Sequence, residues 1–194
     1  AGALLDEHRH RDLVAAAESK LVTTARRVLA VSDINRQRLA ALYGRAPDTM
    51  ELAPNGTHLP EDAWLEGARR GALKASLGFG DSPLAVFVAS YHGPNLEAAQ
   101  AVLDMARLCP GWHFGVAGSV CNDLARRELP RNVHALGVVT EAELTVLLRA
   151  ADVGLNPMKT GSGTNLKLLD YTGHGALVVT TPVGASGLDF TAGA

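Results

Sequence analysis

The chain alternates continuous apolar runs with stretches of helical periodicity, and this alternation constrains its fold more than any other feature. The apolar runs lie at 84–89, 112–117, 132–139, 153–158 and 177–181. Helical patterns separate several of them, at 95–108, 140–151 and 165–173. Continuous apolar runs are expected for strands that are buried on both faces. The sequence therefore predicts an α/β protein: a Rossmann-like parallel sheet with helices on both faces.

The bulk composition excludes several classes of protein. The 194 residues include 18 basic and 20 acidic side chains, a net charge of −2, so we expect no nucleic-acid partner. No apolar run approaches the roughly 20 residues of a membrane-spanning helix, and the charged start of the chain lacks a signal-peptide pattern. Neither the 2 cysteines nor the 7 histidines show metal-ligand spacing, so we expect no metal and no cofactor. A cytoplasmic location is the default prediction.

A glycine-rich loop that runs into a predicted helix is the strongest functional feature. Gly161-Ser162-Gly163-Thr164 follows a predicted strand, and the helical pattern begins at Asn165. Glycines let the backbone approach a ligand closely, and a helix N-terminus presents unpaired N–H groups and a partial positive charge. Together they predict a phosphate site. The loop lacks the Lys-Ser/Thr ending of a P-loop, so ATP hydrolysis is not indicated.

Two charged residues follow on the same predicted helix. Lys167 and Asp170 are three positions apart, so they share a helix face. Lys167 is near enough to the loop to neutralise a phosphate, and Lys159 is a second candidate for that role. The Asp170 carboxylate offers two acceptor oxygens, which suits a pair of ribose hydroxyls. On an ordinary surface the same two residues would be a solvated lysine and acid of little consequence.

The segment GSGTNLKLLDYTGHGALVVTT, residues 161–181, resembles the donor-site signature of retaining glycosyltransferases with the two-domain GT-B fold. It is most similar to the group 1 family, which includes glycogen synthase-like enzymes and bacterial mannosyl- and glucosyltransferases. That family often has two glutamates separated by seven residues. Asp170 matches the second of these acids, whereas Ser162 stands in the place of the first. A subset of the family has a similar Gly-small-Gly-Thr-x-x-Lys version.

The amino-terminal segment resembles the end of the acceptor domain of those enzymes. Residues 28–56 show the same order of strand, helix and strand that ends in Pro-Asn-Gly. We therefore interpret the chain as the carboxy-terminal half of a GT-B fold, without most of the acceptor domain and without the end of the donor domain. Residues 1–56 would be the tail of the acceptor domain, 57–82 the interdomain linker and 83–194 the donor-binding domain.

The resemblance, with the strand order, implies a role for each loop at the ligand edge of the sheet. The residues expected to bind the donor diphosphate and sugar are Gly161, Ser162, Gly163, Thr164, Asn165, Lys167 and His92. Asp170 would bind the ribose. The residues expected to bind the base are Gly118, Ser119, Val139 and Thr140. Catalytic residues are expected in the acceptor domain, so this segment alone would bind donor without turning it over.

The activity that the resemblance implies is transfer of a hexose, with retention, from a UDP- or GDP-linked sugar to an acceptor hydroxyl. The acceptor would be a saccharide, a lipid-linked group or another hydroxyl compound, as in polysaccharide biosynthesis, and peripheral association with a membrane is compatible with it. Two alternatives stay open. One is a degenerate, non-catalytic nucleotide-sugar-binding module, which Ser162 in place of an acid favours. The other is a sugar-nucleotide epimerase on the same fold, which the Lys-x-x-Asp helix fits less well.

Overall fold

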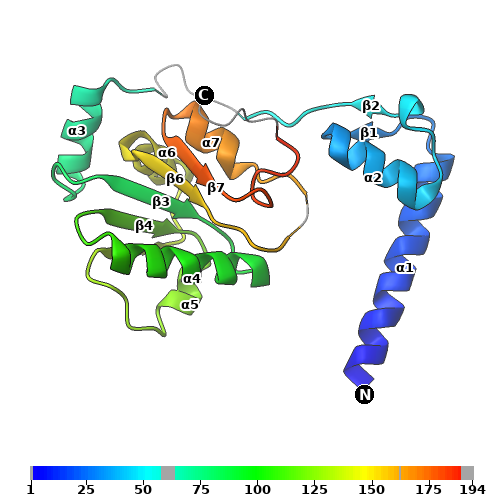
Figure 1. Cartoon of the computed structure of the whole chain (residues 1–194), viewed down its shortest axis with the longest axis horizontal. Coiled ribbons are helices and arrows are strands. Elements are labelled where there is room, and N and C mark those ends of the chain that lie inside the picture. The colour runs from blue at the N-terminus through cyan, green and yellow to red at the C-terminus, as the bar shows by residue number, and fades with distance from the viewer. Residues whose placement is uncertain (1, 58–63, 162, 189–194) are drawn as a thin grey trace. The chain divides into compact units, whose positions relative to one another are not determined.

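The computed structural model describes residues 2–57, 64–161 and 163–188 (Figure 1). The chain divides into two compact units, Ala1–Asn55 and Gly56–Ala194. The segment predicted as a linker, 57–82, belongs to the second unit and contains helix α3 (Gly67–Ser76). The assignment of the first unit to an acceptor domain stays a prediction.

The first unit begins with a helix, which is followed by the predicted order of strand, helix and strand. Its elements are α1 (Gly2–Thr24), β1 (Leu29–Ala30), α2 (Asp33–Tyr43), the 3-10 turn η1 (Pro47–Thr49) and β2 (Glu51–Leu52). β1 and β2 pair in parallel. Ser32 caps α2 by accepting from the backbone N–H of Asn35, and Gly44 ends the helix in the left-handed region, at φ 68°. These local signals explain why α2 has sharp ends.

The second unit is built on a five-stranded parallel sheet with the strand order β5-β4-β3-β6-β7. The strands are β3 (Leu84–Val88), β4 (His113–Ala117), β5 (Val133–Gly137), β6 (Val153–Asn156) and β7 (Leu177–Thr180). The helices after α3 are α4 (Gly93–Leu108), α5 (Cys121–Leu124), α6 (Glu141–Ala150) and α7 (Lys167–Gly173). Helices α4 and α5 pack in one apolar core, and α6 and α7 in another, on the two faces of the sheet (Figure 1). The predicted fold class is confirmed.

Two details differ from the sequence prediction, and each has a local cause. The helix α5 was not predicted, because its 4 residues are too few to show a helical period. Strand β5 ends at Gly137 instead of continuing to residue 139, because Gly137 adopts φ 73° and turns the chain away from the sheet. Thr140 and Glu143 form a capping box at the start of α6, as the Thr-x-x-Glu spacing favours.

The strand order reverses between β3 and β6, the two strands at the centre of the sheet. The chain leaves β3 toward α4 on one face and leaves β6 toward α7 on the other. In a doubly wound sheet such a reversal opens a crevice beyond the carboxyl ends of the strands, and ligands bind there. The topology therefore directs attention to the residues that follow β3 and β6.

Tyr171 joins α7 to both central strands. Its side chain is fully buried, its hydroxyl accepts from the backbone N–H of Val88 at 2.9 Å, and it donates to the backbone oxygen of Leu155 at 3.3 Å. Burial raises the pKa of this hydroxyl, so it stays protonated and able to donate. The ring lies over Gly154, where a Cβ atom would be 2.2 Å from Cγ of Tyr171. A glycine in β6 is thus the condition for this close approach of α7.

Helix α3 is joined by an ion pair to the end of the sheet where β3 and β6 begin. The ammonium of Lys74 lies 2.7 Å from Oδ2 of Asp152, and the same oxygen accepts from the backbone N–H of Leu84 at 2.8 Å. Only 10% of the Lys74 side chain is exposed, so this is an ion pair shielded from water on one side. It connects the segment predicted as a linker to the starts of β3 and β6.

Replacing Gly154 tests the packing of α7 on the sheet. Gly154→Ala is expected to lower the free energy of unfolding by about 1 to 3 kcal/mol, because the new methyl group displaces the Tyr171 ring. Gly115→Ala in β4 is a matched control, since its methyl group would meet Leu147 and Val86 at 3.6 Å, an ordinary contact. Urea unfolding followed by circular dichroism measures both changes. Equal stability of the two variants would contradict this account of Gly154.

Candidate functional site

A cleft of about 630 Å³ opens at the carboxyl ends of the central strands. Its walls come from the ends of β3 and β4, the segment after β5, the start of α4 and the loop that leads into α7. The lining residues are Val88, Ala89, Ser90, Asn95, Gly118, Ser119, Val138, Thr164, Asn165, Leu166 and Lys167. The cleft is therefore at the reversal of strand order, where a doubly wound sheet binds its ligands.

Five of the predicted site residues meet in this cleft. Gly118 and Ser119 directly follow β4, Thr164 and Asn165 lie in the loop before α7, and Lys167 is the first residue of α7. They belong to segments about 45 residues apart in the sequence, so only the fold brings them together. The predictions made separately for a phosphate loop and for a base-binding strand end therefore concern the same cavity.

The remaining predicted diphosphate residues lie around the cleft rather than in its lining. Gly161 and Gly163 are exposed, with φ values of 132° and 86°, a backbone conformation that side chains other than glycine rarely adopt. Ser162 lies outside the described residues. His92 is the exposed N-cap residue of α4, and its side chain makes no capping hydrogen bond. Their roles stay predictions.

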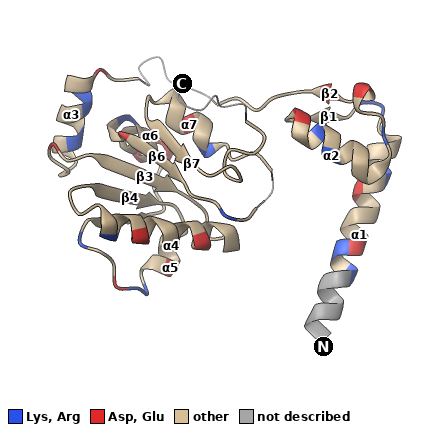
Figure 2. Cartoon of the chain, viewed as in Figure 1, with Lys and Arg blue, Asp and Glu red and all other residues tan. Residues whose placement is uncertain are grey.

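Lys167 is the charged residue among those that line the cleft. Its Nζ atom is buried, and among the described residues it has no hydrogen-bond partner; it lies 4.8 Å from the centre of the Phe87 ring. Loss of hydration lowers the pKa of this ammonium to about 8. Elsewhere on the protein, acidic and basic residues are mixed, as Figure 2 shows for α1 and α4. The cleft thus holds a cation without a counter-charge in the part of the chain that the structure describes.

Thr164 adds a second unpaired polar atom to the cleft. Its Oγ1 atom is buried and likewise has no hydrogen-bond partner among the described residues. Buried polar groups are rarely left unpaired in folded proteins. Two of them, a hydroxyl and an ammonium, lining one cavity at a helix N-terminus indicate a ligand with several acceptor oxygens.

Asn165 holds the loop in place. Its Nδ2 donates to the backbone oxygen of Gly184 at 2.9 Å, and Nδ2 of Asn156 donates to the same oxygen at 3.1 Å. A Cβ atom at Gly184 would lie 2.6 Å from Asn156 Nδ2, so the site requires a glycine. The predicted role of Asn165 was ligand binding; the structure shows that its amide nitrogen already positions the loop against the segment after β7.

The other wall of the cleft is also held by side-chain hydrogen bonds. Gly118 adopts φ 103° and passes so close to β3 that a Cβ atom there would be 2.2 Å from the backbone oxygen of Ala89. The hydroxyl of Ser119 accepts from the backbone N–H of Tyr91 at 2.8 Å. Asn95 Nδ2 donates to the backbone oxygen of Ser90 at 3.0 Å. These hydrogen bonds hold the backbone of this wall in place.

Four lining residues that matter chemically were not predicted from the sequence: Ser90, Asn95, Val138 and Leu166. Val138 is 76% exposed and Leu166 is 49% exposed. They present apolar surface in the cleft, where a flat ring could pack. An apolar residue directly after a strand looks like part of that strand in the sequence, which is why Val138 was missed.

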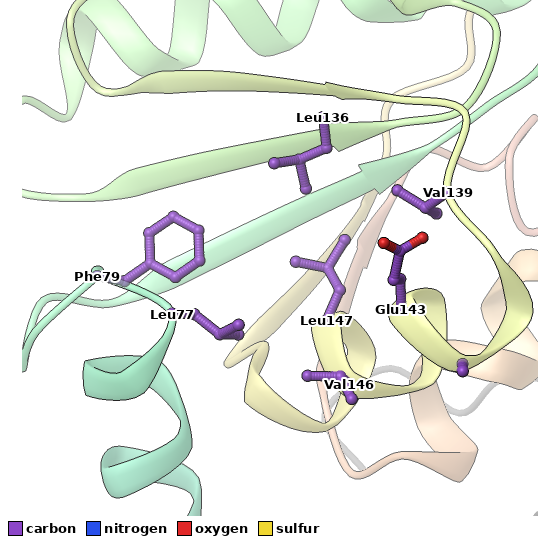
Figure 3. Close-up of a pocket in the computed structure, with 8 residues that line it drawn as sticks. Leu77, Phe79, Leu136, Val139, Glu143, Val146 and Leu147 are labelled. Atoms are coloured by element: carbon purple, nitrogen blue, oxygen red, sulfur yellow. The ribbon is translucent and has the colours of Figure 1, made fainter.

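Val139 and Thr140, predicted to bind a base, do not line the cleft. Val139 lines a separate apolar groove of about 450 Å³ with Leu77, Phe79, Leu136, Ala142, Glu143, Val146 and Leu147 (Figure 3). The hydroxyl of Thr140 donates to the carboxylate of Glu143 at 2.8 Å and accepts from its backbone N–H, so it caps α6. Any contact of these two residues with a base stays a prediction.

Asp170, the predicted ribose ligand, lies in the first turn of α7 but is not part of the lining. Its carboxylate is half-buried and accepts a hydrogen bond from the hydroxyl of Thr57 through Oδ1. The backbone oxygen of Asp170 is bonded to the N–H and Nδ1 of His174, at 3.1 and 2.8 Å. The helix turn that carries this acid is thus well fixed.

Two negative findings apply to the described residues alone. Within them, no group of three or more His, Cys, Asp or Glu side chains is placed to hold a metal ion. No helix in the same residues is long and apolar enough to cross a lipid bilayer.

The chain belongs to the family of group 1 glycosyl transferases. The family profile matches residues 82–190, more than half of the chain and all of the sheet described above. Among curated proteins, no sequence matches this one. The predicted family is therefore confirmed by the profile.

Solved structures of glycosyltransferases share the fold. HepE from Anabaena, in complex with UDP and glucose, superposes with a TM-score of 0.71 at 15% identity, over 91% of this chain and 50% of that one. Sucrose-phosphate synthase from Thermosynechococcus elongatus superposes with a TM-score of 0.68 at 18% identity, over 90% of this chain and 45% of that one. The catalytic domain of starch synthase IV from Arabidopsis thaliana, bound to ADP and acarbose, superposes with a TM-score of 0.67 at 11% identity. The match covers 91% of this chain and 43% of that one. The chain spans half or less of each of these proteins, and its fold is that of half a GT-B enzyme.

The buried ammonium of Lys167 makes a prediction about stability. Lys167→Met is expected to raise the free energy of unfolding at pH 7 by about 1 to 3 kcal/mol, because it removes a charge that burial disfavours. The pKa of Lys167 falls from 10.5 to about 8 on folding, so the unfolded chain binds more protons between these values. The stability of the wild type therefore rises with pH in this window, and the advantage of the variant shrinks.

Urea unfolding at pH 7 and pH 9.5 measures this difference. Lys159→Met is the matched control, because Lys159 is exposed in the loop before α7 and its removal should change stability little at either pH. If the difference in free energy of unfolding between the two variants were the same at both pH values, the Lys167 ammonium would be hydrated in the folded protein.

Proposed function

We propose that this chain is the donor-binding part of a glycosyltransferase that moves a hexose from a nucleoside diphosphate sugar to an acceptor hydroxyl with retention. The observation that carries the proposal is the pair of unpaired polar groups in the cleft, the Lys167 ammonium and the Thr164 hydroxyl. A diphosphate supplies acceptor oxygens and negative charge for both. The family and the nucleotides named in the solved neighbours support the same ligand class.

The diphosphate would lie between Lys167, Thr164 and the start of α4. Helix α4 is 16 residues long and begins beside the cleft, so its free N–H groups add a partial positive charge there. As the sugar departs, negative charge grows on the diphosphate, and a fixed cation lowers the energy of that state. Lys167 would therefore act on the leaving group as well as on binding.

The base and the ribose would occupy the outer part of the cleft. The apolar side chains of Val138 and Leu166 offer surface for the base. Asp170, one turn along α7 from Leu166, would accept from the ribose hydroxyls. Catalytic side chains would come from the acceptor domain, so the chain alone would bind donor without turnover. The acceptor, any association with a membrane and the cytoplasmic location stay predictions.

A non-catalytic nucleotide-sugar-binding module is the second candidate. The observation that favours it is Ser162 in the position where the family often has an acid that contacts the sugar. Such a module would bind the nucleotide but would show no preference for the nucleoside diphosphate sugar over the nucleoside diphosphate.

Calorimetric titration of the chain with UDP, GDP and ADP at pH 7.5 tests the proposal. We expect one nucleotide to bind in the micromolar range, about −8 kcal/mol. Lys167→Met should weaken it roughly tenfold to a hundredfold, and Asp170→Asn roughly tenfold, because each loses a charge-assisted hydrogen bond. Lys20→Met, in α1 of the first unit, is the control that should bind normally. Failure of all three nucleotides to bind would refute the donor-site proposal.

Protonation of Lys167 provides an independent check. With a pKa of about 8 the ammonium is only partly protonated at pH 8, and a bound diphosphate would raise its pKa again. Binding at pH 8 should therefore take up about half a proton, and affinity should fall as pH rises above 8. Titrations in buffers of different ionisation enthalpy measure the uptake. The same uptake by Lys167→Met would assign it to another group.

A further inference from the structure

The proposed ribose carboxylate already has a partner in the chain. The hydroxyl of Thr57 donates a hydrogen bond to Oδ1 of Asp170, and these residues are 113 positions apart in the sequence. Thr57 is exposed and lies two residues after Asn55, where the first unit ends. Within the described part of the chain, residues 54–57 make no other hydrogen bond. The start of the second unit is therefore joined to α7 by the hydrogen bond of Thr57.

A ribose would compete for the same oxygen. A nucleoside presents two neighbouring hydroxyls, and a carboxylate that accepts from both uses its two oxygens side by side. Thr57 supplies a hydroxyl to Oδ1, the kind of donor that a ribose would bring. The argument rests on the proposed function, because it takes Asp170 as the acceptor for ribose.

We propose that Thr57 is an internal competitor for the ribose subsite: its hydroxyl occupies Asp170 in the empty protein and is displaced by the nucleotide. Two consequences follow. The affinity for ribonucleotides is lower than the subsite alone would give, because one hydrogen bond must first be broken. Thr57, two residues after the end of the first unit, is released from α7 when a nucleotide binds. Nucleotide binding is thereby coupled to the freedom of the chain at Thr57.

The exposure of the contact makes this exchange reversible. The hydrogen bond lies at the surface, so water can replace either partner when it opens, and its net contribution to stability is small. A buried bond such as that of Tyr171 to β3 could not exchange in this way, because opening it would leave unpaired polar groups in the core. The hydrogen bond of Thr57 is therefore weak enough to be exchanged for one from a ligand.

The decisive variant removes the hydroxyl and keeps the shape of the side chain. Thr57→Val should bind the preferred nucleotide among UDP, GDP and ADP roughly three- to tenfold more tightly than the wild type, because the competitor is gone. Thr57→Ser keeps the hydroxyl and should bind like the wild type. With the 2′,3′-dideoxy form of the same nucleotide, Thr57→Val and the wild type should bind alike, since no ribose hydroxyl competes.

A second readout follows the tether itself. In the wild type, the NMR relaxation of the Thr57 methyl group should show greater motion after the ribonucleotide is added, and no such change with the dideoxy form. Tighter binding by a general change of the cleft would raise the affinity for both nucleotide forms, which would overturn the proposal.

The possible failures are distinguishable. If a ribonucleotide binds the wild type but Thr57→Val binds it equally or more weakly, Thr57 is not a competitor, and the donor site stands without this inference. If none of the three nucleotides binds the wild type or Thr57→Val, the donor site itself is refuted, and the inference falls with it.

Discussion

The buried hydroxyl of Tyr171 is the contact on which the arrangement of this protein most depends. It bonds to the backbone of β3 and of β6, the two strands between which the sheet reverses its order. It also fixes α7, and with it the start of the helix that carries Lys167 and Asp170. Because Gly154 has no side chain, the ring can lie directly on β6. The geometry of the cleft is therefore set from beneath by core packing.

The cleft combines a rigid wall with unpaired groups. The side chains of Ser119, Asn95 and Asn165 form hydrogen bonds with backbone atoms, and these bonds hold the loops in place. Lys167 and Thr164 keep buried polar atoms without partners among the described residues. Unpaired donors of this kind favour a ligand that has negative charge and several acceptor oxygens. Asp170 differs from them, since its carboxylate accepts a hydrogen bond from the hydroxyl of Thr57.

Much of the second unit was predictable because its signals are local. Continuous apolar runs predict β3 and β6, and the spacing of Thr140 and Glu143 indicates the start of α6. The glycine-rich loop and Lys167 could also be identified, because they lie close together in the sequence. Val138 and Leu166 were not, since exposed apolar side chains look like core residues until the fold shows where they lie. Val139 lines a different groove, and its predicted contact with a base stays a prediction.

The sequence by itself determined the class of fold, the family and the segment that contains the loop before α7, because periodicity, capping and glycine patterns act over a few residues. The tertiary structure alone decided three things: that Gly118 and Lys167 share one cleft, that the Lys167 ammonium is buried, and that Thr57 donates a hydrogen bond to Asp170. Each of these depends on atoms from distant parts of the chain. Burial and hydrogen-bond partners are properties of that packing, and no local pattern in a sequence encodes them.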